Sequence, residues 1–335
     1  MSESADYTPA PHWGGYDFKS ARLAYVHHVD RSYKDAVEKS IDPNTLVPDC
    51  LSTNCESPLV IACDVTGSMG EWPATIFSKL PYLEHEGQEY LGEDMEISFA
   101  AVGDAYSDNY PLQIQDFAKK ADLKSALEKL IHEKGGGGSS EESYDLAASY
   151  YAHNCEMPKA IRKPIFIFIG DEGVYQTLNE DHTNRWARVT SSEKINPTAL
   201  FESLKKKFNV YVIRKPYNCS GNNPSPAETR IKDQWCKLLG DDHVVSLPDP
   251  ARVVDVIFGI LAQEVGRVPY FEKELTDRQN KDTDGKKKID IVLKSLRTIH
   301  KPTMKKLPPV DRAKSITRGL KPSGAKSISL LDDEE

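Results

Sequence analysis

The chain has 335 residues, 39% hydrophobic and 28% charged, a composition typical of a globular protein with one large domain or two modest ones. It has no run of about 18 apolar residues, and residues 1–18 lack the charged-then-apolar pattern of a secretory signal. We therefore expect neither a membrane span nor export. The six cysteines show no CxxC spacing, which argues against a zinc knuckle and favours a cytoplasmic location.

The net charge of −8 is distributed unevenly. Residues 281–326 contain 14 Lys or Arg and 4 Asp or Glu, a charge of +10, whereas residues 327–335 carry −4. Residues 1–280 therefore carry −14. An acidic body argues against nucleic-acid binding by the folded part. The basic segment is the region that could bind nucleic acid or an acidic partner.

Residues 1–57 predict an N-terminal extension that packs on the main domain, because residues 25–28 lie in a short segment that could form a helix or a strand and Pro43, Pro48 and Pro58 interrupt the chain after it. The main domain is expected over residues 58–268.

Within that domain, apolar runs of the kind found in buried strands alternate with helical patterns. The expected strands are 59–63, 97–102, 165–169, 210–213 and 244–247. The expected helices are 74–83, 122–132, 144–153, 199–208, 227–239 and 251–264. Residues 111–117 alternate in polarity and predict antiparallel pairing with the strand at 97–102. The pattern predicts an α/β fold with a mostly parallel central sheet, helices on both faces and one antiparallel edge hairpin.

Residues 269–335 lose this alternation. The lysine run 286–288 and the prolines at 308–309 are typical of flexible segments, and only residues 289–299 are amphipathic enough for a short helix. We therefore expect a flexible basic arm with an acidic tip.

The residues with the clearest chemistry follow the first strand of the domain. Asp64, Thr66 and Ser68 alternate there, and in an open α/β sheet ligands bind beyond the carboxyl ends of the strands. One carboxylate and two hydroxyls suit Mg²⁺, Mn²⁺ or Ca²⁺ better than zinc or copper. Gly67 and Gly70 allow the loop to curl around an ion.

Simpler interpretations of these segments exist. Asp64 could form an Asx turn or cap the next helix. Ser68 lacks the Gly-x-Ser-x-Gly setting of a hydrolase nucleophile. The glycines at 135–138 are not followed by Gly-Lys-Ser/Thr, which argues against a phosphate-binding loop.

The Asp-x-Thr-x-Ser pattern resembles the metal-ion-dependent adhesion site of von Willebrand factor A domains, of the intracellular type, over about residues 58–268. Asp171 follows the strand at 165–169, where the family places an Asp often bound through water. The loop after the glycine run resembles domains that supply a Glu, and alignment on Ala147 selects Glu142, with Glu141 left open as the alternative.

The resemblance implies a Rossmann-like fold that binds a metal ion at the top of the sheet and does not catalyse a reaction. The implied ligands are Asp64, Thr66, Ser68, Glu142 and Asp171. The implied cofactor is Mg²⁺, or Mn²⁺ or Ca²⁺. The implied partner is a protein that presents an Asp or Glu carboxylate, and such domains often act as adaptors for multi-protein machines, including AAA+ ATPases.

Two alternatives remain open at this point. The metal could only stabilise loops within a scaffold protein, or it could act as a Lewis acid in a hydrolase or phosphotransfer enzyme. The second alternative needs a general base, for which the candidates are Glu141, Asp104 and Asp108.

Overall fold

The computed structural model describes Trp13 and residues 17–133, 138–190, 196–217, 224–280 and 283–299. Six strands form the central sheet in the order β10-β9-β7-β2-β3-β4. They are β2 (Pro58–Asp64), β3 (Glu96–Val102), β4 (Leu112–Ile114), β7 (Ile165–Gly170), β9 (Asn209–Arg214) and β10 (Val244–Ser246). Neighbouring strands are parallel except β3 and β4, whose antiparallel pairing places Ala100 opposite Ile114. The predicted α/β class and edge hairpin are therefore confirmed.

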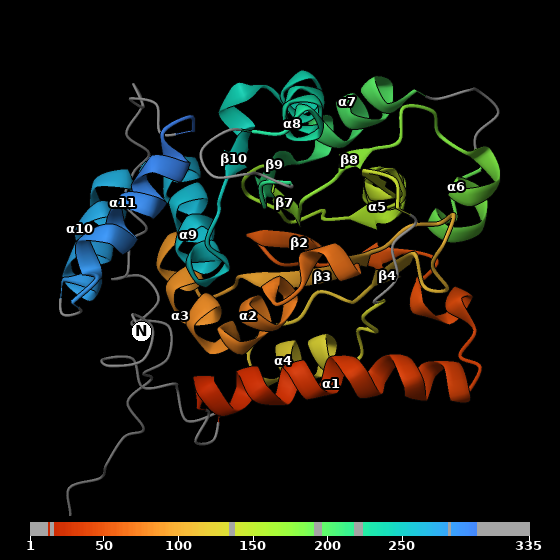
Figure 1. Cartoon of the computed structure of the whole chain (residues 1–335), viewed down its shortest axis with the longest axis horizontal. Helices are drawn as coiled ribbons and strands as arrows, with labels where there is room; N and C mark the ends of the chain where they lie inside the picture. The colour runs from red at the N-terminus through yellow and green to blue at the C-terminus, as the bar shows by residue number, and fades with distance from the viewer. Residues whose placement is uncertain are drawn as a thin grey trace, which may run out of the picture.

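Helices cover both faces of the sheet (Figure 1). One face is covered by α2 (Trp72–Ser78), α3 (Leu80–Leu91) and α9 (Val253–Glu264). The other is covered by α5 (Tyr144–Asn154), α7 (Pro197–Lys207) and α8 (Pro226–Leu239).

The two cores follow directly from the alternation of side chains along β2. Leu59 and Ile61 belong to the core beneath α9, whereas Val60 and Ala62 belong to the core beneath α5 and α8. All seven residues of β2 are buried, because the strand lies in the middle of a sheet that is covered on both faces.

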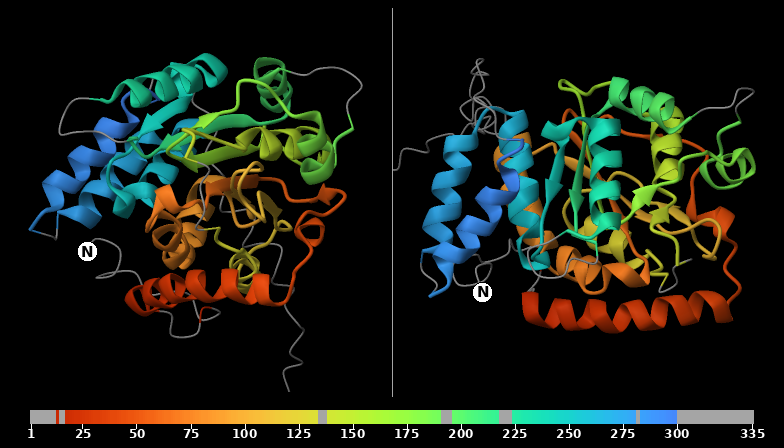
Figure 2. Two further views of the ribbon diagram at one scale, coloured as in Figure 1. Left: turned by 45° about the vertical axis from the view of Figure 1, so that its right-hand side comes forward. Right: turned by 45° about the horizontal axis from the view of Figure 1, so that its top comes forward.

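The remaining elements surround this three-layered body. They are α1 (Phe18–Glu38), β1 (Leu51–Ser52), α4 (Ala121–Glu128), β5 (Glu141–Glu142), β6 (Cys155–Glu156), β8 (Gly173–Val174), α6 (Glu180–Ala187), α10 (Val268–Gln279) and α11 (Gly285–Leu296), with short 3-10 turns at Pro43–Leu46, Gly67–Met69, Asp241–His243 and Pro250–Arg252. The long helix α1 lies outside α2, where the Tyr25 and Phe77 rings meet edge to face at 5.7 Å (Figures 1 and 2).

Two predicted helices differ from the structure. The single helix expected at 74–83 is divided into α2 and α3, because Pro81 lacks the N–H that would donate to the Phe77 carbonyl. The helix expected at 122–132 ends at Glu128. Beyond it, the Ile131 N–H donates to Gln113 Oε1 at 2.8 Å, so an interaction with β4 replaces another helical turn. The other four predicted helices agree with the structure within two residues at each end.

The flexible arm expected from residue 269 is wrong for the part of it that the structure describes. Helices α10 and α11 pack on α9 at one end of the molecule (Figure 2), and Phe271, Leu275, Val292 and Leu296 belong to the main core. The lysine run at 286–288 lies on the outer side of α11, at exposed or half-buried positions, so it does not prevent packing. Residues 300–335, which include most of the predicted arm and its acidic tip, lie outside the described residues.

Gly259 shows how closely α9 and α11 approach each other. A Cβ at this position would lie 2.2 Å from Leu296 Cδ1, so only glycine allows the observed contact. Within the described ranges, none of the helices has the length and apolar character that crossing a lipid bilayer requires.

Candidate metal centre

The strand order creates a switch point beside β2. The chain passes from β2 to β3 on one side and later returns to β7 on the other, so the crossovers diverge at β2 and β7, and ligands of open α/β sheets bind at the carboxyl ends of strands at such a point. Asp64 is the last residue of β2, and Asp171 immediately follows β7. The topology therefore brings these two carboxylates to the same edge of the sheet.

The loop after β2 gathers its oxygens by local geometry. Asp64 Oδ1 accepts hydrogen bonds from Thr66 N at 2.9 Å and from Thr66 Oγ1 at 2.6 Å, so the simple Asx turn does form. Thr66 Oγ1 lies 3.1 Å from Ser68 Oγ. Gly70 closes the turn with a φ of 56°. Glu71 is the N-cap residue of α2, so Asp64 does not cap that helix. The Asp64 carboxylate is directed at the loop itself.

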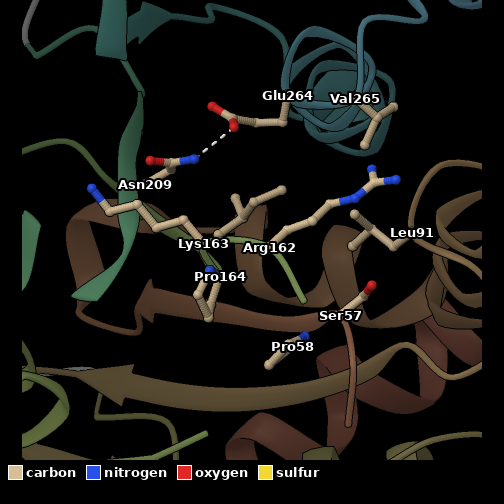
Figure 3. Close-up of a pocket in the computed structure, with 10 residues that line it drawn as sticks. Ser57, Pro58, Leu91, Arg162, Lys163, Pro164, Asn209, Glu264 and Val265 are labelled. Carbon is tan, nitrogen blue, oxygen red and sulfur yellow. Dashed lines mark hydrogen bonds between the residues drawn. The ribbon is translucent and has the colours of Figure 1, made fainter. Parts of the chain in front are cut away.

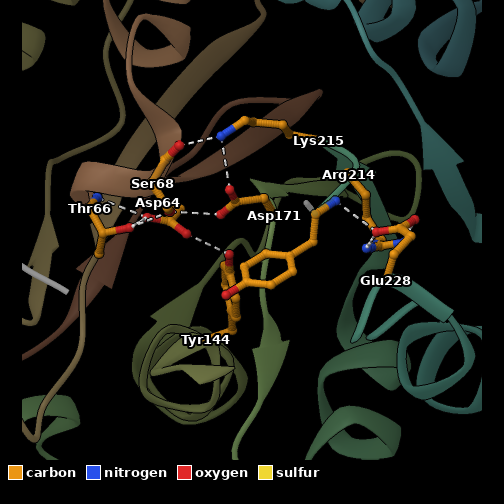
Figure 4. A network of polar contacts seen from close by, with 9 residues as sticks. Asp64, Thr66, Ser68, Tyr144, Asp171, Arg214, Lys215 and Glu228 are labelled. Carbon is orange, nitrogen blue, oxygen red and sulfur yellow. Dashed lines mark hydrogen bonds and ion pairs between the residues drawn. The ribbon is translucent and has the colours of Figure 1, made fainter. Parts of the chain in front are cut away.

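A second set of contacts joins this loop to the rest of the sheet edge (Figure 4). Ser68 Oγ donates to Asp171 Oδ1 at 2.9 Å. Tyr144 Oη, at the start of α5, donates to the remaining oxygen of Asp64 at 2.8 Å. We call Asp64, Thr66, Ser68 and Asp171 the oxygen cluster, since hydrogen bonds connect the four side chains continuously. Four of the five predicted ligands therefore lie together.

The fifth, Glu142, lies beside the oxygen cluster but outside its hydrogen bonds. Pairing of β5 with β8 turns Glu142 inward, where it is 2% exposed and bonds to the Glu172 side chain. The same pairing turns Glu141 outward, and its Oε1 lies 3.6 Å from Arg230 Nη1. One Glu142 oxygen, Oε2, is buried and has no hydrogen-bond partner in the described structure.

Burial of these carboxyls makes their ionisation costly. Loss of solvation is the main cause that raises the pKa of Asp64 from 3.8 to about 7, and the nearby charge of Asp171 is the second. Loss of solvation, the charge of Asp64 and the bond to Glu172 raise the pKa of Glu142 far above its usual range. The edge of the sheet therefore concentrates acidic groups that a cation would stabilise in their ionised forms.

The donor chemistry fits a hard divalent cation. All four members of the oxygen cluster offer oxygen, and Glu142 Oε2 is a further oxygen, without a hydrogen-bond partner among the described residues. In the part of the chain that the structure describes, no three His, Cys, Asp or Glu side chains converge as metal ligands would. This finding agrees with a cluster in which two of the four donors are hydroxyls.

Two residues of the site were not predicted from the sequence. Tyr144 carries no motif, and only the packing of α5 directs its hydroxyl to Asp64. Lys215 directly follows β9, and its Nζ donates to Asp171 Oδ2 at 3.0 Å and to the Ser68 carbonyl (Figure 4). Its position after a predicted strand beside β7 was a usable signal, because residues that follow parallel strands share one edge.

The opposite edge of the sheet holds a small pocket of about 170 Å³ (Figure 3). It lies where β2, β7 and β9 begin, and its lining includes Arg162, Lys163 and Leu91. Asn209 Nδ2 donates to Glu264 Oε2 at 2.6 Å across one side of it. Because the oxygen cluster lies where the same strands end, the pocket is no part of the candidate metal centre.

No protein-family model and no curated protein sequence matches this chain. Among solved structures, it is similar to the pilus adhesin SpaC from Lactobacillus rhamnosus GG in its open conformation, with 9% identity, a TM-score of 0.45, and coverage of 64% of this chain and 31% of that one. It is also similar to proximal thread matrix protein 1 from the mussel byssus with a zinc-occupied MIDAS motif, with 12% identity, a TM-score of 0.40, and coverage of 62% and 45%. The chain thus spans less than half of either structure, and the function proposed below rests on its own residues.

Proposed function

We propose that this chain is a von Willebrand factor A-like domain that binds one divalent cation, Mg²⁺ or alternatively Mn²⁺ or Ca²⁺, and uses it to hold a carboxylate of a protein partner. The observation that carries the proposal is the oxygen cluster itself. Two carboxylates and two hydroxyls from the ends of β2 and β7 meet at the switch point of the sheet.

The composition of the oxygen cluster supports binding of a partner's carboxylate. Mg²⁺ requires six oxygen ligands in near-octahedral geometry and usually keeps several waters. The cluster provides four donors, two of them uncharged, and Ser68 is exposed. The two carboxylates of the cluster balance the charge of a divalent cation held there, and four protein donors leave ligand positions open toward solvent, one of which an Asp or Glu side chain of a partner would fill. The partner would be a protein of a multi-protein machine, with an AAA+ ATPase as one candidate.

The candidate general bases are engaged in local structure, which supports binding over catalysis. Glu141 pairs with Arg230. Asp104 accepts hydrogen bonds from the Tyr106 N–H at 3.0 Å and from the Tyr175 hydroxyl at 2.9 Å. Asp108 Oδ2 accepts the Asp104 N–H at 2.8 Å.

A second candidate function is a structural component of a larger assembly, in which the metal only stabilises loops. One specific observation favours it: Lys215 already cross-links the loop after β2 to the residue after β7, through the Ser68 carbonyl and Asp171. These contacts show that the same two loops are already tied to each other, as a purely structural site requires.

The two candidates differ in whether the bound cation keeps an open position. Calorimetry should detect one Mg²⁺ or Mn²⁺ site in the wild type and none in Asp64→Ala. Bound Mn²⁺ with an open position should relax the protons of bulk water strongly, and added acetate should reduce that effect by displacing the bound water. Identical titrations of wild type and Asp64→Ala would refute a metal site at the oxygen cluster. Metal binding without an acetate effect would favour the structural component.

A further inference from the structure

Lys215 reaches the oxygen cluster from the solvent side. It follows β9, and its backbone N–H donates to the Gly170 carbonyl at 2.9 Å, which fixes the start of its side chain beside β7. The preceding residue, Arg214, is fully buried and directed away, toward Glu228, at 2.7 Å. The Lys215 side chain is 29% exposed, whereas that of Asp171 is 3% exposed (Figure 4).

The ammonium group of Lys215 binds two groups of the loops that would surround a metal. Its Nζ donates to Asp171 Oδ2 and to the main-chain carbonyl of Ser68. Both contacts involve residues of the oxygen cluster, and both are made by a full positive charge. Lysine carries this charge at the end of a flexible four-carbon stem, so the group can leave without movement of the backbone.

We propose that Lys215 is a built-in counter-ion of the candidate metal site, which occupies the oxygen cluster in the absence of metal and is displaced when the metal binds. The inference rests on the proposed function and adds a regulatory property to it. A divalent cation and the ammonium group compete for Asp171, and repulsion between them disfavours simultaneous occupancy. Lys215 therefore sets the metal concentration at which the site fills, and it keeps the acidic edge compensated below that concentration.

The first test compares metal affinities of the full chain by calorimetry with Mg²⁺ alone. Lys215→Met removes the charge and keeps an unbranched side chain, whereas Lys215→Arg keeps the charge. The control variant Lys129→Met removes a charge from an exposed position at the end of α4. If the two cations compete, Lys215→Met should bind Mg²⁺ more tightly by about 5- to 150-fold, the usual range of coupling between two linked sites. Lys215→Arg and Lys129→Met should remain close to the wild type.

The second test follows the wild-type lysine directly, so it does not depend on the folding of any variant. The side-chain NMR signal of Lys215, assigned as the one that Lys215→Arg lacks, should shift as Mg²⁺ is added and should narrow once the ammonium group is released to solvent. A signal that stays unchanged while the metal site saturates would overturn the inference.

The outcomes separate this inference from the proposed function. If the wild type binds Mg²⁺ and Asp64→Ala does not, the metal site stands. In that case equal affinities of Lys215→Met and wild type would refute the role of Lys215 alone. If neither the wild type nor Lys215→Met binds Mg²⁺, both ideas fail. Binding by Lys215→Met but not by the wild type would support the inference most strongly.

Discussion

Asp64 should lower the stability of the protein when no metal is bound. The side chain is fully buried, and its pKa rises from 3.8 to about 7 because of burial and the nearby Asp171. Between these two pH values the folded state holds a proton that the unfolded state has released, so the free energy of unfolding falls as pH rises through this window. At about 1.36 kcal/mol per pH unit, the full effect reaches about 4 kcal/mol as an upper limit.

The variant Asp64→Asn isolates this effect. Asparagine keeps an acceptor for the Thr66 N–H, and its amide group can donate to the Tyr144 oxygen, but it has no charge. In EDTA, the variant should match the wild type near pH 4 and become more stable than the wild type by up to about 4 kcal/mol above pH 7. With Mg²⁺ at 100 times its dissociation constant, the wild type should gain about 2.7 kcal/mol and the variant nothing.

Urea unfolding over a series of pH values, with EDTA or with Mg²⁺, measures both effects. Buried carboxyls that do not interact with Asp64 contribute equally to wild type and variant, so they cancel in the difference. Loss of the Asp64 charge also lowers the pKa of Glu142, and this change is part of the effect assigned to Asp64. A difference in stability that does not change with pH would refute the electrostatic cost assigned to Asp64. Equal stabilisation of wild type and Asp64→Asn by Mg²⁺ would refute the role of Asp64 as a metal ligand.

Three further results are expected. Glu142→Ala should weaken Mg²⁺ binding far more than Glu141→Ala in calorimetry, because only Glu142 faces the site; the opposite order would show that the alignment is off by one residue. Gly170→Ala should cost at least about 1–3 kcal/mol in thermal unfolding, because its Cβ would lie 1.8 Å from the Tyr144 hydroxyl oxygen, and unchanged stability would contradict that contact. Leu296→Ala should cost about 2–5 kcal/mol in urea, whereas a freely moving α11 would make it neutral.

Local patterns were enough to predict the body of the fold and the first half of the site. Apolar runs such as 165–169 became central strands, because a strand covered on both faces needs apolar residues at every position. Asp64, Thr66 and Ser68 are close in sequence, and their hydrogen bonds form within a single turn. Asp171 was predicted from the family resemblance, which places an Asp shortly after the strand expected at 165–169.

The tertiary structure decided what depends on contacts between distant segments. Pairing of β5 with β8 turned Glu142 inward, a choice that a shift of one residue would reverse. Only the order β9-β7-β2 brought Lys215 to Asp171, 44 residues away in the chain. The helices α10 and α11 have short apolar stripes and many charges, so their order comes from the surface of α9 that they cover. Local sequence determines which elements form and which loops can gather oxygens. Contacts between distant segments decide strand register, side-chain direction and which basic side chain, here Lys215, lies beside Asp171.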